Sequence, residues 1–118
     1  QGATAYAAGL LAEEAFEQEL VHQGQKILAR RARMPSGELD LVTQDGDTIV
    51  FVEIKKRRSL EDAAYAISPR QVARIGDAAL EWMQANGLGL VDIRFDAALM
   101  DRYGNSKILK NALDFSIH

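Results

Sequence analysis

Two acidic residues and a lysine are the side chains in this sequence that are best suited to chemistry. Asp40 lies in the hydrophobic segment 37–42, and Glu53 and Lys55 follow in the next segment as a Glu-x-Lys pair. Carboxylate oxygens are ligands that Mg²⁺ and Mn²⁺ prefer, and an ammonium group beside them can orient water or stabilise a phosphate. The pattern therefore indicates a divalent-metal site that acts next to a phosphate group.

The segment 48–55, TIVFVEIK, predicts a buried strand with one face that becomes ionic. Its β-branched and aromatic residues favour a strand, in which successive side chains point to opposite faces. One face carries Val50, Val52 and Ile54, and the other carries Ile49, Phe51, Glu53 and Lys55. Burying a carboxylate or an ammonium costs on the order of several kcal/mol unless a partner or metal compensates it. We therefore expect the two charges to serve a function.

A hairpin is expected to bring Asp40 to the same face. Asp45-Gly46 predicts a two-residue turn, which pairs Asp40 with Phe51 and Glu38 with Glu53. Asp40 is then diagonal to Glu53, with Cα atoms about 7 Å apart. Opposed Glu38 and Glu53 would repel each other unless a cation or a proton lies between them, which again favours a metal site.

A third acid is expected to come from an amphipathic helix over residues 4–23. Its apolar stripe consists of Leu10, Phe16, Leu20 and Val21. Glu13 falls within this stripe and should point inward, as a metal ligand or as a partner of one, with Glu17 as the rival candidate. The simpler interpretation is that these acids cap the helix or reach the solvent.

The basic residues concentrate in the middle of the chain. The net charge is −3, but residues 24–75 hold ten Lys and Arg against seven Asp and Glu. Lys56, Arg57 and Arg58 leave the strand beside the acids, where phosphates would lie. Arg70 and Gln71 begin a later helix, whose positive end also favours phosphate. The alternative interpretation is a solvated surface of mixed charge.

The composition limits the chemistry that is available. The chain of 118 residues has 47% hydrophobic and 26% charged residues, as in one ordinary globular domain. It has no cysteine and two histidines, so a metal must be held by oxygen ligands, which favours Mg²⁺ or Mn²⁺. The Ala-rich start lacks the features of a signal peptide, and we expect a cytoplasmic protein. Because Gln1 is not Met, we expect native residues before it.

The remaining elements complete an α/β pattern. Residues 25–33 predict a strand or irregular edge, and Ser68 followed by Pro69 predicts the start of a second helix that Asn86-Gly87 ends. Its apolar face consists of Val72, Ile75, Ala79, Trp82 and Met83. Residues 91–99 predict a strand, residues 103–106 a turn, and the tail through Phe115 a last short strand. The expected order is αβββαββ around a mixed sheet.

Several short motifs together resemble the YraN-like family of small bacterial proteins. They are Gly37-Glu38-Leu39-Asp40-Leu41, Asp45-Gly46-Asp47, Phe51-Val52-Glu53-Ile54-Lys55, Arg57, Arg94-Phe95-Asp96 and Asn111-Ala112. That family is similar to archaeal Holliday-junction resolvases of the PD-(D/E)xK nuclease superfamily. Departures from its pattern are Ala12 for the usual Gly, Arg31 for a frequent Asn, and Arg70 for the usual Lys.

The resemblance implies one restriction-endonuclease-like, three-layer domain over residues 1–118, with a mixed central sheet flanked by helices. It also implies an endonuclease that hydrolyses DNA, with Asp40, Glu53 and Lys55 as catalytic residues and with Asp40, Glu53 and Glu13 as metal ligands. Resolvases act as dimers, so a homodimer is a candidate form by analogy.

Two other functions compete with this one. A nucleic-acid-binding module could keep the scaffold without turnover, and a plain α/β interaction protein could use the acids as a structural ion-pair network. The residues do not choose between DNA and RNA, or between branched and linear substrates.

Overall fold

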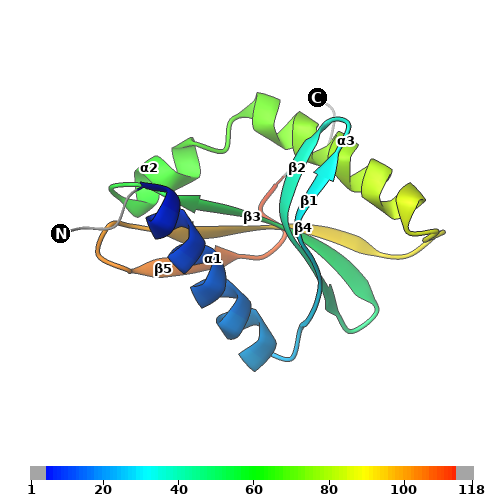
Figure 1. Cartoon of the computed structure of the whole chain (residues 1–118), viewed down its shortest axis with the longest axis horizontal. Helices are drawn as coiled ribbons and strands as arrows, with labels where there is room; N and C mark the ends of the chain where they lie inside the picture. The colour runs from blue at the N-terminus through cyan, green and yellow to red at the C-terminus, as the bar shows by residue number, and fades with distance from the viewer. Residues whose placement is uncertain (1–4, 114–118) are drawn as a thin grey trace.

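The computed structural model describes the backbone of residues 5–113 and the side chains of residues 11–113. It has helices on both faces of a five-stranded sheet (Figure 1). The helices are α1 (Ala5–His22), α2 (Leu60–Tyr65) and α3 (Pro69–Ala85), and the strands are β1 (Lys26–Met34), β2 (Gly37–Asp45), β3 (Thr48–Lys56), β4 (Ile93–Met100) and β5 (Ser106–Leu109). The predicted α/β class and three-layer arrangement are confirmed.

The described strands follow one another across the sheet in chain order. The β3–β4 pair is parallel and the other pairs are antiparallel, so the sheet is mixed as expected. α2 and α3 supply the crossover that a parallel connection requires. α1 packs on the face that carries Leu41, Val50 and Val52, and the other two helices pack on the face of Phe51 and Phe95. None of the described helices is long and apolar enough to span a membrane.

The second predicted helix is confirmed as α3. The Ser68 hydroxyl accepts a hydrogen bond from the Gln71 N–H at 3.2 Å, and Pro69 occupies the first turn, where its missing N–H costs nothing. The buried face consists of Ile75, Ala78, Ala79, Trp82 and Met83. The short helix α2 was not predicted, because six residues are too few to show a helical period; Ser59 caps it.

The turn between β2 and β3 differs from the predicted one by a single residue. Asp45 pairs with Thr48, so the loop consists of Gly46 and Asp47. Gly46 has a φ of +63°, and a type II′ turn places glycine at its first central position. The predicted pairing of Asp40 with Phe51 is therefore wrong, since Phe51 pairs with Val42. The pairing of β2 with β3 shifts by two residues, and because side chains alternate with a period of two, every side chain keeps its predicted face.

β1 is an edge strand, as the irregular sequence suggested. A bulge lies between Ile27 and Ala29, and Arg31 has a left-handed φ of +46°. The tip of the β1–β2 hairpin is fixed to α3, because the Glu81 carboxylate accepts hydrogen bonds from the Ser36 N–H at 2.9 Å and from its hydroxyl at 2.6 Å. This anchor holds the start of β2 against α3.

Two sequence predictions fall partly outside the described residues. The predicted last strand extended through Phe115, whereas β5 ends at Leu109, and residues 114–118 are not described. The side chain of Leu10, predicted on the apolar stripe of the first helix, is also not described. Phe16 and Leu20 of that stripe are buried as expected, but Val21 is 54% exposed.

Candidate functional site

Asp40, Glu53 and Lys55 meet at one place on the sheet. Leu41 pairs with Val52, so the next position on each strand brings Asp40 to Glu53. The Asp40 Oδ2 accepts a hydrogen bond from the Ile54 N–H at 2.8 Å, and the Glu53 carboxylate lies close enough to raise the pKa of Asp40. The Lys55 Nζ lies 3.2 Å from the Glu53 Oε2. The predicted convergence of these three groups is therefore observed.

The environment of Asp40 favours its protonated form. Burial raises the pKa of its carboxyl most, and the negative charge of Glu53 raises it further. The hydrogen bond from Ile54 and the positive charge of Lys55 lower the pKa but do not compensate, and the result is a pKa of about 7. Near neutral pH, in the absence of a cation, a large share of the Asp40 carboxyl groups therefore carries a proton.

Glu53 is the more deeply placed acid of the pair. Its side chain is 3% exposed, whereas that of Lys55 is 17% exposed and so reaches the surface. Glu38 does not face Glu53 as predicted, because the register moves it along the strand. Its carboxylate lies 3.7 Å from the Nε of Arg33, its neighbour on β1. The repulsion that the site must relieve therefore comes from Asp40 and Glu53.

Burial of an acid does not by itself indicate a functional site, because the buried Asp96 has a purely structural explanation. Asp96 is fully buried, yet both of its carboxylate oxygens bind the Arg94 guanidinium at 3.0 Å, and Oδ1 also accepts the Asn111 N–H at 2.8 Å. Such an acid is satisfied by the protein alone. Asp40 differs because another acid is among its immediate neighbours.

The acids of α1 are engaged elsewhere. Glu13 forms two hydrogen bonds to the Arg31 guanidinium, at 2.9 and 3.3 Å, and Glu17 accepts one from Arg30 at 2.8 Å. Within the described part of the chain, no three side chains of His, Cys, Asp and Glu are grouped closely enough to hold a metal. The structure therefore brings together two of the three predicted ligands and leaves Glu13 in an ion pair.

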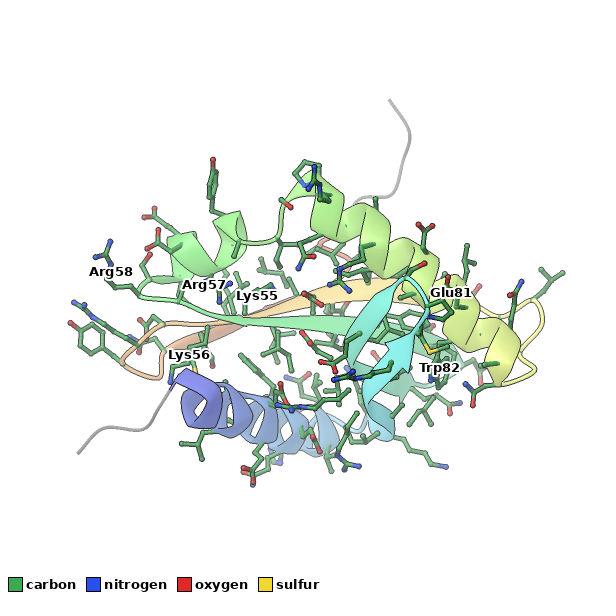
Figure 2. The ribbon with its side chains drawn as sticks, turned by 45° about the horizontal axis from the view of Figure 1, so that its top comes forward. Lys55, Lys56, Arg57, Arg58, Glu81 and Trp82 are labelled. Atoms are coloured by element: carbon green, nitrogen blue, oxygen red, sulfur yellow. The ribbon has the colours of Figure 1, made fainter. Side chains whose placement is uncertain are left out.

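The predicted phosphate-contacting residues lie at two places. Lys55 and Lys56 are the last two residues of β3 and Arg57 and Arg58 follow them, well separated from Glu81 and Trp82 (Figure 2). Arg57 and Arg58 are exposed, and the Arg58 Nε lies 3.9 Å from Asp62. Arg70 is exposed at the start of α3. Gln71 instead accepts a hydrogen bond through its side chain from Arg74 at 2.8 Å.

Arg74 is the site residue that the sequence analysis missed. Its Nη2 lies 3.9 Å from the Glu53 Oε2, and its Nη1 donates a hydrogen bond to the Glu38 carbonyl at 3.2 Å. Helical spacing contained a usable signal, because residues i and i+3 share one face of a helix. Gln71 was already a candidate for contact with phosphate, and Arg74 lies three residues later on the same face of α3.

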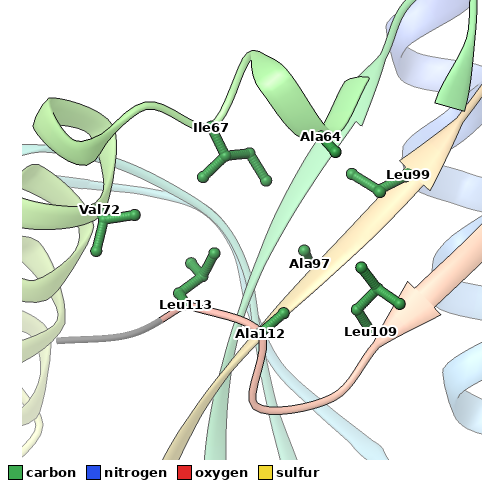
Figure 3. Close-up of a pocket in the computed structure, with 8 residues that line it drawn as sticks. All are labelled: Ala64, Ile67, Val72, Ala97, Leu99, Leu109, Ala112 and Leu113. Carbon is green, nitrogen blue, oxygen red and sulfur yellow. The ribbon is translucent and has the colours of Figure 1, made fainter. Parts of the chain in front are cut away.

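A cavity of about 150 Å³ lies on the same face of the sheet but has a different character. Its lining is apolar and comes from α2, α3, β4 and the end of the described chain (Figure 3). Ala97 of this lining pairs with Glu53 across the β3–β4 ladder. No titratable side chain lines the cavity, so Asp40 and Glu53 lie outside it.

Fold and site together define a three-layer α/β domain with a paired carboxyl and lysine centre at the β2–β3 junction. The model of the uncharacterised protein family UPF0102, the YraN family, matches residues 12–100. The chain belongs to this family, which confirms the resemblance that its motifs suggested.

Relatives in the same family match over most of the chain. A UPF0102 protein of Bradyrhizobium sp. (strain ORS 278) is 42% identical over 113 residues, which are 95% of this chain and 80% of the relative. One of Rhodopseudomonas palustris (strain BisB18) is 42% identical over 95% of this chain and 84% of its own length. One of Cereibacter sphaeroides (strain ATCC 17025) is 40% identical over 94% and 96%, respectively.

Proposed function

We propose that this protein is a divalent-metal-dependent endonuclease that hydrolyses phosphodiester bonds of DNA. One observation carries the proposal. The Asp40 and Glu53 carboxyl groups lie close enough for the charge of Glu53 to raise the pKa of Asp40, with the Lys55 Nζ 3.2 Å from Glu53. An acid pair of this kind is unfavourable in a folded protein unless a proton or a cation compensates it.

The donor set fits Mg²⁺ or Mn²⁺. Both ions prefer oxygen ligands, and Mg²⁺ is commonly held by one or two carboxylates while water and substrate phosphate complete its shell. Asp40 and Glu53 would hold the ion, with the Ile54 carbonyl as a further oxygen ligand. When bound, such an ion supplies positive charge to the scissile phosphate and lowers the pKa of water.

The backbone of Ile54 and the side chain of Lys55 have separate roles beside the metal. The Ile54 N–H holds the Asp40 carboxylate in place, at 2.8 Å. Lys55, which is held by Glu53 and reaches the surface, orients or deprotonates the attacking water, or stabilises the charge that develops on the phosphate. Each role needs the Nζ close to the acids, which the pairing of Glu53 with Lys55 provides.

The substrate backbone is expected to follow the basic end of β3. Lys56, Arg57 and Arg58 supply affinity that does not depend on base sequence, and Arg70 adds a cation at the start of α3. We place the reaction in the cytoplasm, where DNA is accessible. A homodimer is the form we expect if the substrate is a four-way junction, because such a junction has two symmetric cleavage points.

A non-catalytic nucleic-acid-binding protein is the second candidate. One observation favours it: the described residues assemble two acids rather than three, because Glu13 is paired with Arg31. This candidate predicts salt-sensitive binding to DNA that survives the change Asp40→Ala. A plain interaction protein predicts neither binding of DNA nor heat on titration with Mn²⁺.

The test is cleavage of supercoiled plasmid and of a four-way junction in Mg²⁺ and in Mn²⁺. Asp40→Ala and Glu53→Ala should lose cleavage, and Asp77→Asn, which changes an exposed acid on α3, should not. DNA binding with no cleavage by the parent would favour the second candidate. Cleavage by the alanine variants at the rate of the parent would exclude the proposed site.

A further inference from the structure

Arg74 is held in one orientation by two hydrogen bonds. Its Nε donates to the Gln71 Oε1 at 2.8 Å, and its Nη1 donates to the Glu38 carbonyl at 3.2 Å. A guanidinium is planar, so two bonds from different nitrogens fix its plane. The side chain is 28% exposed, and solvent therefore reaches a group that is already oriented.

The remaining nitrogen of Arg74 faces the acid pair without binding it. Nη2 lies 3.9 Å from the Glu53 Oε2, which is longer than a hydrogen bond, while the Lys55 Nζ lies 3.2 Å from the same oxygen. Among the described residues, no hydrogen bond from Nη2 is present. Arg74 thus offsets the charge of Glu53 and keeps N–H donors for a ligand beside it.

The backbone of β2 makes room for this arginine. A Cβ atom at Gly37 would lie 2.2 Å from the Arg74 Nη1, and Gly37 has a φ of +149°, which side chains rarely adopt. The first residue of the Gly-Glu-x-Asp motif therefore has a physical role. It lets β2 approach the guanidinium closely enough for the Glu38 carbonyl to bind it.

The geometry points to Arg74 as the phosphate-binding residue of the proposed metal site. It neutralises Glu53 while no cation is bound, and it binds a non-bridging phosphate oxygen of the substrate when a cation occupies the acids. Gln71 acts through Arg74 as a positioning residue. The inference rests on the proposed function and adds to it the group that holds the substrate phosphodiester, for which Arg is well suited.

This role predicts two effects of opposite sign. Loss of the Arg74 charge removes the repulsion between a cation on Glu53 and the guanidinium, so the cation should bind more tightly. Loss of the same group removes a phosphate contact, so DNA should bind more weakly. A purely structural role for Arg74 would weaken both, because the acids themselves would be displaced.

The experiment compares Arg74→Gln and Arg74→Lys with Lys26→Gln, which removes an exposed charge at the opposite end of the hairpin. Calorimetric titration with Mn²⁺ at pH 8 measures cation affinity. Fluorescence anisotropy of a labelled DNA duplex in Ca²⁺ measures DNA affinity. Thermal unfolding followed by circular dichroism checks that each variant is folded.

For Arg74→Gln we expect Mn²⁺ to bind about threefold to tenfold more tightly and DNA about fivefold to tenfold more weakly. Arg74→Lys keeps the charge but loses the planar fork, so Mn²⁺ should bind as in the parent and DNA more weakly. Lys26→Gln should change Mn²⁺ affinity less than about twofold.

The outcomes separate this inference from the function on which it rests. If the parent binds Mn²⁺ through Asp40 but Arg74→Gln changes neither affinity, or weakens both, the role of Arg74 is wrong and the metal site stands. If the parent binds no Mn²⁺, the metal site fails and the inference fails with it.

Discussion

The Asp40 carboxylate accepts a hydrogen bond from the backbone N–H of Ile54, at 2.8 Å, directly beyond the paired positions Leu41 and Val52. A side chain here takes the place of a backbone acceptor at the point where β2 leaves β3. The position of the carboxylate is therefore set by the strand register and not by a flexible loop. Several measurable consequences follow from this placement.

The first consequence concerns stability in the absence of metal. The pKa of Asp40 is about 7 in the folded protein and 3.8 in its ordinary state. Between these values the folded protein binds more protons than the unfolded one, so the contribution of Asp40 to the free energy of unfolding falls as pH rises. This contribution is fully present below pH 3.8, the ordinary pKa of Asp40, and is lost as the pH rises through about 7, its pKa in the folded protein.

Urea unfolding in EDTA across this pH range measures the effect. The variant Asp40→Asn keeps an oxygen for the Ile54 N–H and cannot ionise. We expect it to lack the decline and to be more stable than the parent by about 1–3 kcal/mol at pH 8. Equal slopes for the parent and the variant would show that Asp40 does not titrate in this way.

The second consequence concerns cation binding. Because Asp40 is partly protonated near neutral pH, a cation must displace that proton. We expect Mn²⁺ affinity to rise about tenfold per pH unit below the Asp40 pKa and to level off above it. Calorimetry in buffers of different ionisation enthalpy measures the released proton directly, and a pH-independent affinity would contradict the presence of a proton on Asp40.

The third consequence concerns Lys55. We expect Lys55→Met to lower the cleavage rate by about 10²-fold to 10⁴-fold, because the group that acts on water or phosphate is removed. DNA binding in Ca²⁺ should change by less than about threefold, since other basic residues supply backbone affinity. Lys26→Met is the matched control for cleavage. Equal losses of binding and cleavage would assign Lys55 to substrate affinity alone.

A fourth prediction, independent of Asp40, concerns the anchor of the β1–β2 hairpin. In Glu81→Gln the Ser36 N–H and hydroxyl lose a charged acceptor, which should lower the free energy of unfolding by about 1–2 kcal/mol. Hydrogen exchange should also increase at the start of β2, near Gly37. Asp77→Asn, on an exposed position of the same helix, should change neither quantity.

The sequence was sufficient for the parts of the fold that have a clear period or a specific breaker. The alternation in residues 48–55 and the Ser68-Pro69 start of α3 led to correct elements. The alternation of side chains along a strand was also enough to put Asp40 and Glu53 on one face of the sheet. The turn was misplaced by one residue. Asp-Gly is typical of the two central positions of a type I′ turn, whereas Gly46 occupies the first central position of a type II′ turn.

The rest of the site depended on contacts between distant segments. Glu13 lies where its helical position suggested an inward direction, but the pairing of α1 with β1 gives it Arg31 as a partner. Arg74 approaches Glu53 because the hairpin tip is fixed to α3 through Glu81. Helical spacing from Gln71 could have pointed to Arg74, but the partners Arg31 and Glu53 are set by packing of elements far apart in the chain.

The most direct test of the central claim is the position of bound Mn²⁺ in crystals, located by its anomalous scattering. We expect one peak within coordination distance of the Asp40 and Glu53 carboxylates, and no peak there in crystals of Asp40→Asn. A peak at another site, or none at Mn²⁺ concentrations that saturate the protein in solution, would contradict it.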